Sequence, residues 1–83
     1  MRVTLGPKAA DDLEDLPLAI HVRVLRILER LESWPSVSGA KPLSGSLAGH
    51  YRIRTGDYRV QFRIEGDAVV VEKIGHRARF YED

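Results

Sequence analysis

The chain contains no cysteine, so neither a disulfide bond nor a thiolate metal site can stabilise it. It also lacks a signal peptide and any apolar run long enough to cross a bilayer. We therefore expect a cytoplasmic protein with no membrane partner. Neither a glycine-rich nucleotide-binding loop nor a His/Asp/Glu cluster with metal-ligand spacing is present, so we expect no cofactor and no metal ion.

The size and composition that remain are typical of one small globular domain. The chain has 83 residues, of which 43% are hydrophobic and 30% are charged. A chain this short buries only a thin hydrophobic core. We expect residues 1–83 to form a single domain, whose core either holds alone or is helped by a partner.

The net charge of +1 hides an uneven distribution of charge. Residues 1–48 carry six basic and six acidic side chains, whereas residues 50–63 carry four arginines against one aspartate. A near-neutral protein with a local basic site is suited to recognising a few phosphates at one place, rather than to coating nucleic acid. The arginines of the last third are Arg52, Arg54, Arg59, Arg63, Arg77 and Arg79.

The spacing of apolar residues predicts two helices after a short first strand at residues 2–5. The first helix is expected over residues 8–16. The second is expected over residues 18–34, where apolar residues recur at steps of three and four until Pro35 ends the pattern. Residues 35–49 are rich in proline, serine and glycine, and they are expected to form a connection.

Three strands are expected to follow, over residues 49–55, 58–65 and 68–74, separated by Gly-Asp pairs that favour tight turns. The last of them is apolar on both faces at its start, which predicts a central or covered position. The order β-α-α-β-β-β predicts an α+β fold, with two helices packed on one face of a mostly antiparallel four-stranded sheet.

Within residues 49–63, two runs that alternate between apolar and polar, mostly basic, side chains flank a Thr-Gly-Asp turn. Successive side chains of a strand point to opposite faces, so Tyr51 and Ile53 share one face while Arg52 and Arg54 share the other. The hairpin would therefore present several guanidiniums side by side. Like charges this close cost stability, and an anionic partner, with phosphate as the obvious candidate, would remove that cost. The simpler alternative is a solvated face whose arginines pair with Glu65 or Glu72.

Metal-free cleavage of RNA requires three chemical roles. One group takes the proton of a 2′-hydroxyl, others neutralise the charge that develops on the phosphate, and one protonates the leaving 5′-oxygen. Arginines suit the second role and are poor at the other two. Tyr81, His76 or His50 could transfer protons if surrounding positive charge shifts the pKa of the side chain.

The run from Leu47 to Val60, followed by Ile74-Gly75-His76-Arg77 and Phe80-Tyr81, resembles the RelE/ParE superfamily of toxins from bacterial and archaeal type II toxin–antitoxin pairs. The resemblance covers nearly the whole chain in element order. A Y-R-x-R-x-G-x-Y-R string with a G-H-R-x-x-x-Y tail places the chain nearer to the RelE branch, ribosome-dependent messenger RNA endonucleases, than to the ParE branch, which inhibits DNA gyrase.

The resemblance implies an active site, in which the first two positions are arginine where the best-known members carry lysine. The implied catalytic residues are Arg52, Arg54 and Arg59 around the scissile phosphate, Tyr81 as the base, and Arg77 at the leaving oxygen. Further contacts with RNA are expected from Arg63, His76 and Arg79, although Arg63 lies outside the motif. Tyr81 could alternatively pack on the edge of the core.

The resemblance also implies partners. We expect a ribosome with messenger RNA in its A site, and a cognate antitoxin whose disordered segment folds on this chain and places acidic side chains near its arginines. Two other functions remain open at this point. The chain could be a ParE-like inhibitor of gyrase without nuclease activity, or an inactive member that serves only as a binding partner.

Overall fold

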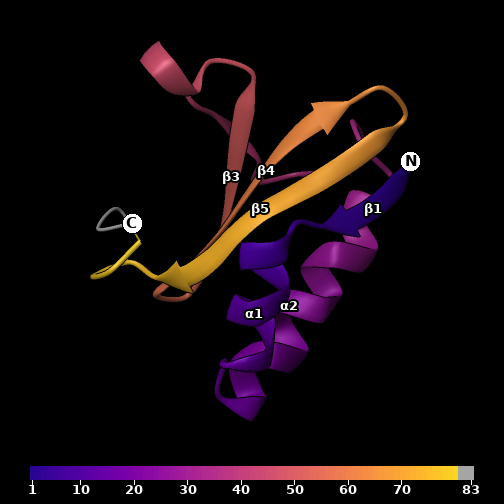
Figure 1. The fold of residues 1–83 in the computed structure, drawn as a ribbon. Helices are drawn as coiled ribbons and strands as arrows, with labels where there is room; N and C mark the ends of the chain where they lie inside the picture. The colour runs from indigo at the N-terminus through magenta and orange to yellow at the C-terminus, as the bar shows by residue number, and fades with distance from the viewer. Residues whose placement is uncertain (81–83) are drawn as a thin grey trace.

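The computed structural model describes residues 1–80, which form two α-helices on one face of a five-stranded sheet (Figure 1). In chain order the elements are β1 (Arg2–Leu5), α1 (Pro7–Glu14), α2 (Leu18–Leu31), β2 (Lys41–Pro42), the short 3₁₀ helix η1 (Gly45–Leu47), β3 (His50–Thr55), β4 (Tyr58–Glu65) and β5 (Ala68–His76).

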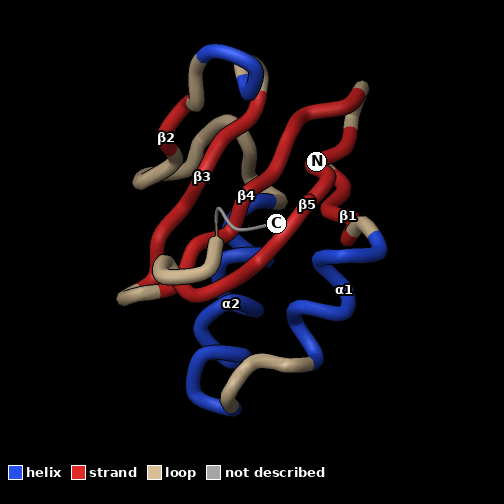
Figure 2. The backbone as a smooth tube through the Cα atoms, turned by 60° about the vertical axis from the view of Figure 1, so that its left-hand side comes forward, coloured by secondary structure: helices blue, strands red, loops and turns tan. Residues whose placement is uncertain are grey.

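The strands lie in the order β1-β5-β4-β3-β2, which Figure 2 shows in red. Only the pair β1 and β5 is parallel, and the other three pairs are antiparallel. The predicted α+β fold and the central position of the last strand are confirmed. The predicted number of four strands is wrong, because Lys41 and Pro42 pair with β3 as a fifth. A two-residue edge strand that contains proline carries no alternating pattern from which it could be predicted.

Both helices are shorter than the sequence predicts. The first begins at Pro7, whose fixed backbone suits the first helical turn, and the second ends at Leu31 rather than Trp34. Trp34 nevertheless belongs to the core. Its ring lies 4.7 Å from that of Tyr51 and 5.3 Å from that of Phe62, both edge to face. The apolar period therefore continued through Trp34 because the chain packs there, although the helix had already ended.

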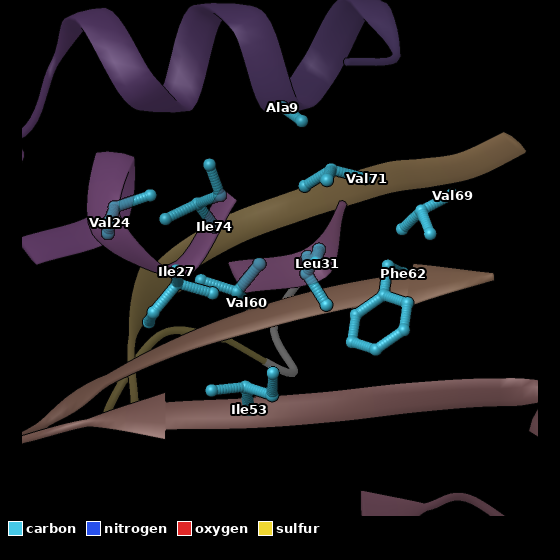
Figure 3. Close-up of a cluster of buried hydrophobic side chains, with 10 residues drawn as sticks. All are labelled: Ala9, Val24, Ile27, Leu31, Ile53, Val60, Phe62, Val69, Val71 and Ile74. Carbon is cyan, nitrogen blue, oxygen red and sulfur yellow. The ribbon is translucent and has the colours of Figure 1, made fainter. Parts of the chain in front are cut away.

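The core lies between the helices and the sheet (Figure 3). Side chains of α2, β4 and β5 dominate it, because the apolar stripe of the helix and alternate residues of the strands face each other. Each strand therefore leaves its other set of side chains on the face of the sheet away from the helices. The buried cluster comprises Ala9, Val24, Ile27, Leu31, Ile53, Val60, Phe62, Val69, Val71 and Ile74.

Two glycines set the hairpins that join β3, β4 and β5. Gly56 has a φ of 58° and Gly66 a φ of 60°, a conformation that costs residues with a Cβ more than glycine. The aspartates that follow them do not share it, since no residue other than glycine has a positive φ in the described part of the chain. The first hairpin places Arg54 directly opposite Arg59.

A β-bulge interrupts the pairing of β4 with β5. Gln61 pairs with Lys73 and Phe62 with Val71, so Glu72 is an extra residue in β5. The bulge changes the phase of the strand, which allows Val71 and Ile74 to be buried against the helices although three positions separate them. Glu72 and Lys73 consequently both lie on the side of the sheet away from the helices.

Asp12 of α1 covers the edge of β5 beyond the point where β1 ends. The side chain accepts a hydrogen bond from the backbone N–H of Ile74 at 2.9 Å. A backbone donor that would otherwise be available to another strand is therefore satisfied within the chain. The contact also fixes α1 against the end of the sheet where the arginines of the first hairpin lie.

Candidate functional site

Three rows of side chains cross the face of the sheet that the helices leave uncovered, here called the open face. Neighbouring strands are about 4.8 Å apart, so the members of a row are adjacent. In order along β3 and β4, the rows are His50 with Arg63, Arg52 with Gln61, and Arg54 with Arg59. Lys41 of β2 and Lys73 of β5 extend the middle row on its two sides, and Gly75 of β5 ends the last row.

The last row forms the cationic end of the open face. Arg54 is exposed and makes no ion pair within residues 1–80, although Arg59 stands directly opposite. Arg77 joins them at the adjoining turn, where its backbone N–H donates to the carbonyl of Asp57 at 2.7 Å. Its guanidinium lies 3.7 Å from the carboxylate of Asp57, and because both side chains are 65% exposed this ion pair is weak. The fold thus gathers Arg52, Arg54, Arg59 and Arg77 at one end of the sheet.

Glu72 dominates the opposite end of the open face. It accepts hydrogen bonds from Nδ1 of His50 at 2.6 Å, from Nε2 of Gln61 at 3.3 Å and from Arg63 at 3.3 Å. Arg63 also bonds Glu65 at 2.7 Å, and this contact holds the pKa of the guanidinium above its usual value. Glu65 and Glu72, which the sequence offered as partners for the arginines of the hairpin, therefore both bond Arg63. Their carboxylates balance the charge of Arg63.

The segment after β5 returns to the open face at Phe80. The ring is only 3% exposed, and a Cβ added to Gly75 would lie 3.6 Å from it. The ammonium of Lys73 lies 4.3 Å from the centre of the Phe80 ring and donates a hydrogen bond to the backbone carbonyl of Phe80. Phe80 is therefore anchored beside the row that contains Arg59. The predicted base Tyr81 lies outside the described residues.

His76 and Arg79 lie beside the end of β5, outside the three rows of the open face. His76 pairs with Tyr58, whose position in β4 is in phase with the buried Val60, and the two rings meet edge to face at 5.3 Å. Nδ1 of His76 accepts a hydrogen bond from the N–H of Ala78 at 3.1 Å. Arg79 lines a hollow of about 310 Å³ with these rings, and Gly75 and Phe80 of the open face line the same hollow. The strand pairing places neither predicted RNA-binding residue in the arginine rows, and the hollow adjoins the end of the last row at Gly75.

The sequence did not predict that two lysines, Lys41 and Lys73, lie on the open face. Lys41 lies in a segment expected to be a loop, and Lys73 is brought to this face by the bulge. Lysines in a connecting segment and at the end of an apolar strand give no signal of their own. Only the pairing of the strands shows that both belong to the row of Arg52.

A family model described as the ParE toxin of the type II toxin–antitoxin system parDE matches residues 3–81. The chain belongs to the RelE/ParE family of type II toxins. The resemblance found in the sequence is therefore confirmed. The family description names ParE, whereas the named relatives are RelE-type proteins, so membership alone does not select the activity.

Two relatives and a solved structure match most of the chain. The chain is 35% identical to toxin RelG of Mycobacterium tuberculosis over 75 residues, 88% of this chain and 86% of the relative. It is 28% identical to toxin RelE3 of Methanocaldococcus jannaschii over 85 residues, 99% and 97% of the two chains. The RelB–RelE antitoxin–toxin complex of Methanococcus jannaschii has a chain that superposes with a TM-score of 0.81 at 26% identity, covering 95% of each chain.

The described part of this toxin, residues 1–80, offers arginine-rich chemistry rather than a metal centre. No group of three or more His, Cys, Asp or Glu side chains in it is placed to hold a metal ion. No helix in the same range is long and apolar enough to span a membrane. The available groups at the cationic end are guanidiniums, which bind phosphate through paired N–H donors and stabilise negative charge that develops on it.

The role of Glu72 in the toxin is testable by substitution. We expect Glu72→Ala to destabilise the fold by about 1–3 kcal/mol, because it removes the half-buried acceptor of His50 and Gln61. Glu65→Ala is the matched control, since Glu65 also bonds Arg63 but is 65% exposed, and it should leave the unfolding midpoint nearly unchanged. Urea unfolding measures both. Equal losses of stability in the two variants would show that the hydrogen bonds of Glu72 with His50 and Gln61 do not stabilise the fold.

Proposed function

We propose that this toxin is a messenger RNA endoribonuclease that acts on messages in the ribosomal A site. One observation carries the proposal. Arg54 and Arg59 are held directly opposite each other on an uncovered face, with Arg52 in the next row and Arg77 at the adjoining turn. Guanidiniums placed this close together can bind a scissile phosphate and stabilise the negative charge that develops on it.

The proposed reaction requires no metal. The 2′-oxygen of the RNA forms a bond to phosphorus and the bond to the 5′-oxygen breaks, which gives a 2′,3′-cyclic phosphate and a 5′-hydroxyl. Arg52, Arg54 and Arg59 hold the phosphate and its extra negative charge. Arg77 stabilises the leaving oxygen, which takes up a proton from solvent because a guanidinium holds its own protons too tightly to act as an acid. By its place in the family motif, Tyr81 takes the proton of the 2′-hydroxyl.

The small size of the cationic end supports a role for the ribosome. Four guanidiniums neutralise only a few phosphates, and binding of this kind to free RNA is weak and falls steeply with salt. A message held in the ribosomal A site is already positioned, so the toxin need not supply the binding free energy that orients the strand.

We also propose a cognate antitoxin as partner, in keeping with the RelB–RelE complex to which this chain is similar. Apolar side chains line the outer side of α2 at steps of four and three, where Leu18 is 79% exposed and Val22 and Leu25 are each 40% exposed. An amphipathic antitoxin segment would cover this line, and a continuation of the antitoxin chain around the sheet would bring acidic side chains to the open face. Binding would raise the apparent stability of the small core by mass action.

Primer extension on a known transcript tests the nuclease. Induction of the toxin in cells should produce breaks inside translated codons, with 5′-hydroxyl ends, and the same transcript with its start codon removed should stay intact. The ParE description of the family favours gyrase inhibition as the second candidate. Intact messages together with arrested gyrase would establish that candidate and refute the nuclease.

A further inference from the structure

A hollow of about 350 Å³ lies between the segment that leads into β2 and the neighbouring strand β3. Its lining consists of Gly39, Ala40, Lys41, Arg52 and Arg54. We propose that it is a second phosphate-binding subsite, in which Lys41 holds an RNA phosphate next to the scissile one. The inference rests on the proposed function, since it assigns the same RNA strand to both places.

The charge of the lining is uniformly positive. Lys41 stands directly beside Arg52 in the strand register, and no carboxylate of residues 1–80 lines the hollow. Lys41 is exposed and makes no ion pair within residues 1–80, and the same holds for Arg54. The acids of the open face, Glu65 and Glu72, bond Arg63 at its other end. Lys41 and Arg54, two exposed cations that line one hollow, are available to an anion there.

The shape of the hollow allows a backbone phosphate to approach. Gly39 and Ala40 line it, and a Cβ built on Gly39 would meet nothing within 4 Å. Small residues at this position leave the three cationic side chains accessible from the open face.

Continuity with the arginine rows favours an RNA strand over an acidic peptide. Arg54 both lines the hollow and stands opposite Arg59, so one side chain lies between the two proposed phosphate positions. Arg52 and Arg54 are two residues apart in β3, about 7 Å along the strand. A polymer with regularly spaced phosphates can occupy both positions at once. The simpler alternative is that Lys41 and Pro42 only protect the edge of the sheet from other strands.

The test is binding of a short RNA whose 2′-hydroxyls are methylated, which blocks the proposed attack. Loss of one phosphate contact should reduce the slope of log affinity against log salt concentration by about 0.7. We expect this reduction for Lys41→Gln, and we expect Lys41→Arg to retain the wild-type slope. Arg26→Gln is the matched control, because it removes one exposed positive charge from α2 and should leave the slope unchanged.

Several outcomes would overturn the subsite. They are an unchanged slope for Lys41→Gln, an equal change for Arg26→Gln, and no binding of the methylated RNA by the wild-type chain. A polyglutamate peptide that displaces this RNA equally well from the wild type and from Lys41→Gln would also count against the subsite. Because the RNA cannot be cleaved, the subsite can stand when the nuclease fails. Cleavage of messages by the wild type, together with an unchanged salt dependence of RNA binding for Lys41→Gln, would support the nuclease and refute the subsite.

Discussion

Replacement of Arg59 by alanine is expected to lower the rate of messenger RNA cleavage by about 100- to 1000-fold, the usual cost of removing one preorganised group that stabilises developing charge. Arg59 is half-buried in the middle of the cationic end, between Arg54 and Gly75 in its row. Arg59→Lys keeps the charge but loses the paired donors of the guanidinium, so we expect a partial recovery. Cleavage is measured on ribosomes programmed with a defined message.

The controls separate catalysis from folding. Arg26→Ala removes an exposed arginine from α2 and should leave the cleavage rate unchanged, and the thermal midpoint of Arg59→Ala should stay close to that of the wild type. Toxicity and cleavage that survive Arg59→Ala would refute the assignment of the arginine rows. Toxicity that survives without any cleavage of messages would favour the gyrase-inhibiting function.

Replacement of Phe62 by alanine is expected to destabilise the fold by about 3–5 kcal/mol. Phe62 has no exposed surface, and its ring stacks on Tyr51 at 5.6 Å and meets Trp34 edge to face at 5.3 Å. The substitution removes the largest fully buried side chain and leaves a cavity between two rings. Domains of this size are stable by only about 5–15 kcal/mol, so much of that margin would be lost.

Urea unfolding provides the measurement for this second prediction. Leu18→Ala is the control, because Leu18 is 79% exposed and its loss should leave the unfolding midpoint almost unchanged. A loss below about 1 kcal/mol for Phe62→Ala would show that the three-ring cluster tolerates a cavity, contrary to its dense packing. If the alanine variant does not fold, Phe62→Leu should give a smaller loss that can still be measured.

Local patterns account for most of what could be predicted from the sequence. Steps of three and four between apolar residues located α2, and the alternation over residues 51–63 assigned the arginines to one face of a hairpin. Both patterns follow from the geometry of a single element, 3.6 residues per turn or two per pleat, so they can be recognised without knowing what the element packs against. The helix end at Leu31 was missed because Trp34 continues the apolar period after the hydrogen bonds of the helix stop.

The sequence by itself determined the helices, the two hairpins with glycine at their turns, and an arginine-rich face. Tertiary structure alone decided which other groups share that face. Pairing with β3 brought Lys41 beside Arg52, the bulge turned Glu72 toward His50 and Arg63, and packing on Gly75 placed Phe80 beside the last row. These contacts join one strand to another or to the segment that follows it, and they depend on partners that no local pattern records. Only the assembled sheet therefore shows the two ends of the site.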